Sequence, residues 1–97
     1  MPQPDDAEAV RIDKWLWRAR FFKTRALAAK AAAAGFRLNG ERSGKTHALV
    51  RPGDAITFRQ ARRVRVIRVL DVGERRGPAA EAAALYEDLD PEIGART

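Results

Sequence analysis

The spacing of apolar residues changes at Gly35, and this change limits the chain to a fold in which helices precede strands. Before Gly35, Ile12, Leu16 and Ala19 recur at intervals of four and three residues, the period of an amphipathic helix. After it, short apolar runs are separated by Asn-Gly and Pro-Gly turn dipeptides, which is typical of short strands. The order of the two patterns predicts an α+β fold.

Two helices are expected in the first third of the chain. The first lies within Arg11–Arg20, where Asp13 suits a helix start because its carboxylate can accept hydrogen bonds from free backbone N–H groups. The second runs over residues 25–34, with Thr24 as its N-cap residue and Gly35 in a left-handed cap after its end. The apolar stripe expected on the buried face of the second helix is Leu27, Ala31 and Ala34.

Three to five short, mostly antiparallel strands are expected after Gly35. The segments that read as strands are Phe36–Leu38, Ala48–Val50, Ala55–Arg59 and Val64–Leu70. In the last of them, alternation predicts that Val64 and Val66 face the core. Arg63 and Arg65 are then expected to face water. The Ala-rich segment 78–86 predicts a short final helix, with proline at its start.

A chain of 97 residues has room for one modest core. Residues 1–9 are expected to form a disordered leader, residues 10–70 the folded domain, and residues 71–97 a C-terminal extension that carries the short helix. The expected fold is therefore α+β, with two N-terminal helices packed on a small, mostly antiparallel sheet and a short C-terminal helix.

Basic residues are concentrated in the middle of the chain. Between Val10 and Arg68, 16 Lys and Arg residues stand against three acids, a local net charge of +13, while both ends of the chain are acidic. An arginine-rich proteome would explain many arginines, but protein surfaces ordinarily intersperse both signs of charge. The imbalance therefore favours a polyanionic partner, with nucleic acid as the first candidate.

Several function classes lack the residues that they need. The chain has no cysteine, which excludes disulfides and cysteine zinc sites. No apolar stretch approaches the roughly 18 residues of a membrane span, and the first residues lack the layout of a signal peptide. The lone His47 has no other metal-ligand types near it, and no paired acid, base or nucleophile indicates catalysis. We expect a cytoplasmic binding protein that is not an enzyme and needs no cofactor or metal.

Four segments, in the correct order, resemble the S4-type RNA-binding domain. They are Arg11–Leu16, Lys23–Arg25 with Ala28, Gly35–Gly40, and Val50–Ile56. Further segments make the chain similar to the ribosome-associated heat-shock protein 15 family over nearly all of Val10 to Glu87. These are Asp13–Trp17, Arg20–Phe21, Arg42–Ser43, Arg75–Ala82 and Leu85–Glu87. Family members often continue into a longer lysine-rich C-terminal helix, whereas residues 87–90 are acidic here.

The resemblance implies an RNA-binding surface made of two packed helices and the adjoining hairpin, within residues 10–70. It implies binding to structured ribosomal RNA on the large ribosomal subunit, in a heat-shock or stalled-translation response, with tRNA as a further partner. The implied RNA-binding residues are Arg11, Lys14, Arg18, Lys23, Thr24, Arg25, Arg37, Asn39, Arg42 and Lys45. Asp13 is expected to cap the first helix or to orient Arg25. We expect the protein to be a monomer.

Two alternatives stay open on the residues alone. A general nucleic-acid adaptor would bind tRNA, other RNA or DNA mainly by charge, without preference for the ribosome. A protein-interaction module would use Trp15, Trp17 and the acidic C-terminal residues. Two residues apart on a helix, the tryptophans point in nearly opposite directions, so at most one belongs to the core. The arginines of residues 59–68 either extend an RNA footprint or protect an edge strand from self-pairing.

Overall fold

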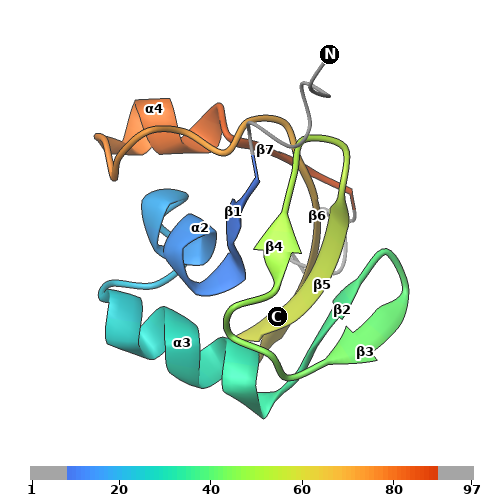
Figure 1. Ribbon diagram of the computed structural model, residues 1–97. Helices are drawn as coiled ribbons and strands as arrows, with labels where there is room; N and C mark the ends of the chain where they lie inside the picture. The colour runs from blue at the N-terminus through green and yellow to red at the C-terminus, as the bar shows by residue number, and fades with distance from the viewer. Residues whose placement is uncertain (1–8, 90–97) are drawn as a thin grey trace.

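The computed structural model describes residues 9–89, and it places the helices on one side of the molecule and the main sheet on the other (Figure 1). The helices are α2 (Ile12–Arg18), α3 (Arg25–Ala34) and α4 (Ala79–Ala83). The strands are β1 (Val10–Arg11), β2 (Phe36–Leu38), β3 (Glu41–Ser43), β4 (Leu49–Val50), β5 (Ala55–Gln60), β6 (Arg63–Val69) and β7 (Tyr86–Asp88). The α+β class is confirmed. Residues 1–8 of the expected leader and residues 90–97 of the extension lie outside the described residues.

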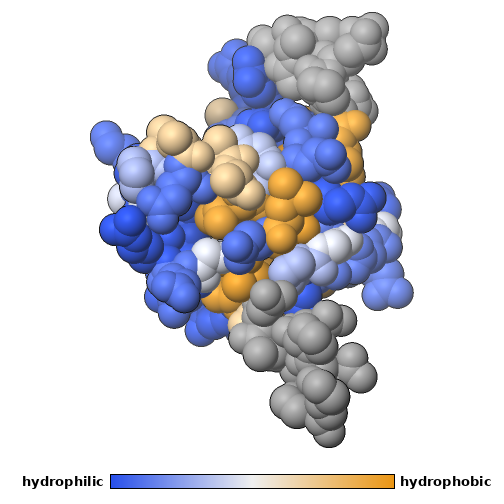
Figure 2. All heavy atoms as spheres, turned by 90° about the horizontal axis from the view of Figure 1, so that it is seen from above, coloured by the Kyte–Doolittle hydropathy of each residue, from blue (hydrophilic) through white to orange (hydrophobic). Residues whose placement is uncertain are grey.

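The strands form one five-stranded antiparallel sheet in the order β3-β2-β5-β6-β7, and β1 and β4 form a separate pair. The main sheet therefore has five strands, within the predicted three to five, and the pair formed by β1 and β4 is additional. Strands of two or three residues are too short to show alternation, so β1, β3 and β7 have no readable pattern in the sequence. Seen from above, the surface is mostly hydrophilic, with a smaller apolar area near its centre (Figure 2).

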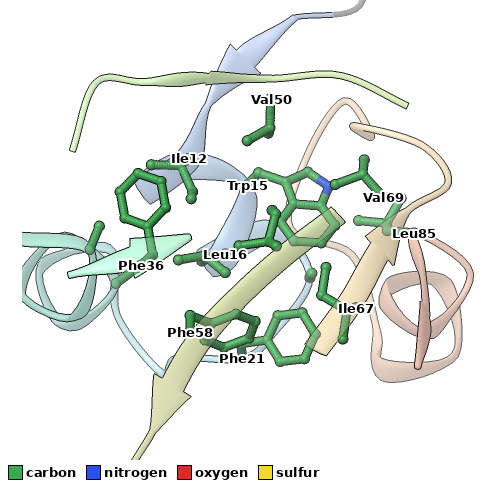
Figure 3. Close-up of a cluster of buried hydrophobic side chains, with 14 residues drawn as sticks. Ile12, Trp15, Leu16, Phe21, Phe36, Val50, Phe58, Ile67, Val69 and Leu85 are labelled. Atoms are coloured by element: carbon green, nitrogen blue, oxygen red, sulfur yellow. The ribbon is translucent and has the colours of Figure 1, made fainter. Parts of the chain in front are cut away.

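The core lies between the helices and one face of the sheet. Its largest fully buried side chains are Trp15, Ile12, Leu16, Ile56, Ile67, Val50 and Val69. Figure 3 shows side chains from α2, β4, β5 and β6 converging on Trp15. Phe21 packs edge-to-face on Phe58, with ring centroids 4.9 Å apart, and lies 4.5 Å from Tyr86. The predicted stripe of the first helix, Ile12, Leu16 and Ala19, is buried as expected.

The bounds and the N-cap of α3 match the prediction, but its buried face does not. The Thr24 hydroxyl accepts a hydrogen bond from the Leu27 N–H at 3.1 Å, and Gly35 has a φ of 121°. The buried residues are Ala28 and Ala32, while Leu27 is 47% exposed and Ala34 is also exposed. The predicted stripe was wrong because small side chains, and not the larger leucine, let this helix approach the rest of the core closely.

Strand β6 presents the opposite face to the one predicted. Ile67 and Val69 are buried, and the period of two along a strand places Arg65 on their side of the sheet. Val64, at 40% exposure, lies on the outer face. Burial of Ile67 and Val69 therefore determines which face of β6 packs on the core, and the alternation at the exposed start of the strand does not.

The segment after β6 contains a helix and a strand, where only a helix was predicted. Pro78 precedes α4 as expected, but the helix ends at Ala83. Tyr86–Asp88 then pairs with β6, and Val69 lies opposite Tyr86. The alanines carry a helical signal, whereas the pairing of β7 depends on a neighbour that only the fold supplies.

Candidate nucleic-acid interface

A buried carboxylate organises the start of α2. Asp13 is only 3% exposed, and its two oxygens accept hydrogen bonds from the Arg11 guanidinium at 3.1 and 2.9 Å. A guanidinium nitrogen of Arg25 lies 3.9 Å from the same carboxylate. Both arginine side chains stay 46% exposed, so each can still reach a ligand. Asp13 therefore holds two cations beside each other, one from the residue before α2 and one from the start of α3, and a bidentate pair fixes the direction of Arg11.

Asp13 also satisfies a free N–H of the helix. Its Oδ1 accepts a hydrogen bond from the Lys14 backbone N–H at 2.7 Å, one of the groups that have no partner within a helix. Asp13 thus accepts from a free N–H group at the helix start, as predicted. It does so from within the first turn, since the N-cap position is occupied by Arg11, whose side chain forms no capping hydrogen bond. The ion pair between Arg25 and Asp13 agrees with the expectation that Asp13 orients Arg25.

The loop before β4 lies against this end of α2. The Ile12 and Asp13 N–H groups donate to the Ala48 and Thr46 carbonyls, at 2.8 and 3.4 Å. These bonds hold exposed Lys45, the neighbour of Thr46, near the start of α2. Lys14 is half-buried on α2, and Lys23 is exposed just before α3. Of the residues predicted to bind RNA, Arg11, Lys14, Lys23, Thr24, Arg25 and Lys45 thus lie around the starts of α2 and α3. We call this set, together with Asp13, the α2–α3 surface.

The residues predicted on the β2–β3 hairpin have different surroundings. Asn39 has a φ of 52°, and its amide donates to Asp54 at 3.1 Å and accepts from the Ala55 N–H at 2.8 Å. Its side chain therefore ties the turn to the start of β5. Arg37 and Arg42 are directly opposite each other on neighbouring strands and are exposed. They belong to the outer face of the sheet and not to the face that packs against the helices.

Arg18 has a structural contact for which the sequence carries no signal. Its guanidinium donates to the Gly73 carbonyl at 2.7 Å and to the Val72 carbonyl at 3.3 Å, while its Nε is buried without a partner. It is half-buried against the segment that follows β6. Much of its hydrogen-bonding capacity is thus used within the protein, and we leave it out of the α2–α3 surface.

Three more side chains bind the same region to α2. Trp15 donates from Nε1 to the Asp71 carbonyl at 2.9 Å, and Arg20 donates to the Gly77 carbonyl at 2.6 Å. Arg76 donates to the Trp17 and Phe22 carbonyls at 2.7 and 2.9 Å and stacks over the Trp17 ring. We call residues 71–77 with these contacts the latch. Hydrogen bonds from side chains to distant backbone carbonyls leave no pattern in the sequence, so the latch could not be predicted from it.

The arginines of residues 59–68 do not share one role. Arg65 is only 14% exposed, pairs with Asp88 at 3.1 Å, and stacks on Phe21. Arg68 donates to the Gly53 carbonyl at 2.9 Å, whereas Arg59, Arg62 and Arg63 are exposed. Because β6 pairs with β5 and β7, it is an interior strand. The suggestion that these residues protect an edge is therefore wrong for β6.

Two further observations concern residues 9–89. No group of three or more His, Asp or Glu side chains in this part of the chain is arranged to hold a metal ion, and His47 is exposed in the loop before β4. Nor is any described helix both long and apolar enough to cross a membrane.

Comparisons with known proteins agree with this geometry. The model of the S4 domain family matches residues 10–56, which include α2, α3 and the β2–β3 hairpin. Heat shock protein 15 of Escherichia coli (strain K12) is 44% identical over 91 residues, which cover 93% of this chain and 68% of that protein. The heat shock protein 15 homolog of Aeromonas salmonicida is 42% identical over 98 residues, covering 99% of this chain and 74% of the homolog.

A solved structure shares the fold. The trimeric structure of Vibrio cholerae heat shock protein 15 superposes with a TM-score of 0.79 at 39% identity, covering 92% of this chain and 90% of that one. The high identity over nearly the whole chain and the matching fold lead to one conclusion: the chain belongs to the heat shock protein 15 family and carries an S4 domain, an RNA-binding module.

Proposed function

We propose that this protein binds structured ribosomal RNA on the large ribosomal subunit, through the α2–α3 surface, in a heat-shock or stalled-translation response. The observation that carries the proposal is the pair of half-exposed arginines, Arg11 and Arg25, held beside each other by buried Asp13. A rigid guanidinium fork matches the oxygens of a phosphate, and its fixed direction lowers the entropy lost on binding. The charge of +13 over Val10–Arg68 supplies the long-range attraction.

We further propose that the protein acts by binding and not by catalysis, as one chain on each RNA site. The partners of Asp13, the one buried acid of the described residues, are cations and a backbone N–H. This is the environment of a structural carboxylate and not of a general base. The Vibrio cholerae relative is trimeric in its solved structure, so the mass of this protein in solution, with and without RNA, tests the one-chain arrangement.

The test of ribosome preference is co-sedimentation. Purified protein is mixed with large subunits, small subunits and a molar excess of tRNA, and each fraction of a sucrose gradient is assayed for the protein. We expect it in the large-subunit fraction, and we expect the double variant Arg11→Ala, Arg25→Ala to stay at the top of the gradient. Arg75→Ala is the control, because it removes an arginine that is 70% exposed and lies outside the α2–α3 surface.

Equal distribution between both subunits and tRNA would instead support the adaptor that binds any nucleic acid by charge.

The apolar area seen in Figure 2 favours a second candidate, a protein partner. Trp15 is not available for such a contact, because it is fully buried. Salt separates the two kinds of partner, since phosphate contacts weaken steeply with ionic strength and apolar contacts do not.

A further inference from the structure

The outer face of the main sheet carries a row of arginines. Residues paired across antiparallel strands point to the same face, and so do residues two apart on one strand. Arg37 of β2 pairs with Arg42 of β3 and with Thr57 of β5, and Arg59 lies two residues after Thr57. Val64 of β6 pairs with Arg59. These five side chains share the face opposite to Phe36, Ile56 and Phe58, which are buried in the core.

The same five residues line an open groove of about 590 Å³, which begins beside Gly35 at the end of α3. Arginines thus come from three neighbouring strands, with the Thr57 hydroxyl and the exposed Val64 side chain between and beside them. We call this the arginine groove. It combines charge, a polar group and a small apolar surface in one shallow site.

In the part of the chain that the structure describes, the one side-chain hydrogen bond of these arginines is from Arg37 to the Gly40 carbonyl at 3.4 Å, which does not explain why they lie together. Within residues 9–89, none of Arg37, Arg42 and Arg59 forms an ion pair with a carboxylate. Like charges directly opposite each other in a sheet are destabilising, and Arg37 faces Arg42 in this way. Arg65, on the inner face, is by contrast paired with Asp88. A local arrangement that costs stability without compensation is expected where a ligand supplies the missing partner.

We propose that the arginine groove is a second RNA-contact surface, which binds the phosphodiester backbone of a strand beyond the one held by the α2–α3 surface. The inference rests on the proposed function, because both surfaces bind the same RNA. An open, shallow groove accommodates an extended backbone, and guanidinium groups recognise its phosphates. Val64 offers a ribose or base an apolar contact. A second copy of the chain that docks through the same groove is disfavoured, because it would bring the same positive charge.

The path between the two surfaces follows the chain. Strand β3, which carries Arg42, ends at Ser43. Lys45 follows two residues later, on the loop that reaches the start of α2. Both Arg42 and Lys45 are exposed. An RNA strand that passes from one face to the other around the β3 edge would run beside Lys45, so we expect Lys45 to lie under the connecting phosphates.

The first experiment maps the contact directly. Uniformly 15N-labelled full-length protein is titrated with a short RNA hairpin that has a single-stranded extension, and amide shifts are followed by NMR. We expect shifts at Thr57, Val64 and Val66, in addition to shifts on α2 and α3. Shifts confined to α2 and α3 would overturn the groove but leave the proposed function in place. No shift at any residue would overturn both.

The second experiment counts phosphates. The pair Arg42→Gln, Arg59→Gln removes two charges from the groove, and the pair Arg62→Gln, Arg75→Gln removes two exposed charges outside it. Each phosphate contact contributes about 0.7 to the slope of log K against log[salt] on single-stranded RNA, so the groove pair should lower its magnitude by about 1.4. Affinity at about 0.1 M salt should fall by roughly tenfold, and the control pair should lower neither quantity as much.

Two results would overturn the inference. Equal losses for the two pairs would show that only total charge matters. Shifts at Thr57 and Val64 that depend on protein concentration without RNA would assign the groove to a second copy of the chain. The melting temperature of the groove pair should equal or exceed that of the parent, because the variant relieves like-charge repulsion, and this readout separates lost binding from lost folding.

Discussion

A buried charge needs compensation, and the surroundings of Asp13 supply it. Among residues 9–89 it is the one charged side chain that is almost fully buried. Its carboxylate receives hydrogen bonds from Arg11 and from the Lys14 backbone, and an ion pair from Arg25. Removing one member of this set leaves a polar or charged group without its partner, and the resulting loss of stability exceeds the net contribution of any single bond. Asp13 therefore affects both folding and the α2–α3 surface.

Asp13→Ala should lower the free energy of unfolding by about 1–2 kcal/mol, since it removes a first-turn acceptor and a partner of two arginines. For a domain of this size that corresponds to a melting temperature lower by roughly 4–15 °C. RNA affinity should be unchanged or slightly weaker, although a negative charge is lost, because Arg11 and Arg25 lose their fixed directions. Differential scanning calorimetry and fluorescence anisotropy measure the two effects.

Asp13→Asn is the matched control, because the amide oxygen can still accept the Lys14 N–H while the charge is gone. It should retain more stability than Asp13→Ala. A variant that melts like the parent and binds RNA more tightly would show that Asp13 is an ordinary surface acid, in conflict with its burial.

Arg11→Ala and Arg25→Ala should each weaken RNA binding by about 1–2 kcal/mol, the value of a charge-assisted contact. Arg25→Ala should leave the melting temperature nearly unchanged, because its side chain is half-exposed and lies 3.9 Å from the Asp13 carboxylate. Arg11→Ala should also lower the melting temperature, because the buried carboxylate loses two hydrogen bonds. Arg75→Ala, measured alongside by fluorescence anisotropy at one fixed salt concentration, is the comparison. An equal loss for Arg75→Ala would mean that bulk charge, and not the geometry around Asp13, determines affinity.

At the scale of elements, the latch connects the segment after β6 to α2 and to the link between α2 and α3. The two ends of the latch, at Asp71 and Gly77, accept hydrogen bonds from α2 residue Trp15 and from Arg20 just after that helix. Arg76 reaches back to the carbonyls of Trp17 and Phe22, on either side of the turn into α3. The extension thus braces the link between α2 and α3, and it helps to fix the relative positions of Arg11 and Arg25.

Arg76→Ala should therefore destabilise the protein by about 1–3 kcal/mol, because two carbonyls lose their donor in a half-buried site. Arg75→Ala removes the adjacent arginine, whose pair with Glu81 is exposed, and should change stability by less than about 0.5 kcal/mol. Urea unfolding followed by tryptophan fluorescence compares the two. Similar midpoints for both variants would contradict the bracing role of the latch.

At the scale of the whole molecule, positive charge lies on two faces. The α2–α3 surface and the arginine groove lie on opposite sides of the sheet, while Arg18, Arg20, Arg65 and Arg76 are bound within the protein. The net charge of +6 therefore understates what RNA meets, because the acids are concentrated near the ends of the sequence.

If some five to eight phosphates are neutralised, log K should fall against log[salt] with a slope of roughly −4 to −6 on single-stranded or irregular RNA. Fluorescence anisotropy from about 0.05 to 0.3 M salt measures it. A flat response would refute RNA binding by phosphate contacts, and it would favour the apolar area seen in Figure 2 as the functional surface.

Much of the fold is open to prediction because its signals are local. The period of α2, the Thr24 cap and the Gly35 stop of α3, and the turn at Asn39-Gly40 each depend on residues close together in the sequence. The charge of the central segment is likewise a property of composition, and composition alone favours a nucleic-acid partner. The order of motifs adds the family resemblance, which the comparisons confirm.

The tertiary structure decided which side chains stay free to bind. Arg11 and Arg18 look alike in the sequence, two turns apart at the two ends of one helix, yet Arg11 is held outward by Asp13 and Arg18 is bound to the latch. Arg37 and Arg42 were expected on the hairpin beside the two helices, as part of one RNA-binding surface, but strand pairing turns them to the outer face beside Arg59. Sequence periodicity reports the local conformation of the backbone. The partner that a long, flexible side chain meets depends on segments that are distant in the chain, and only folding brings those segments together.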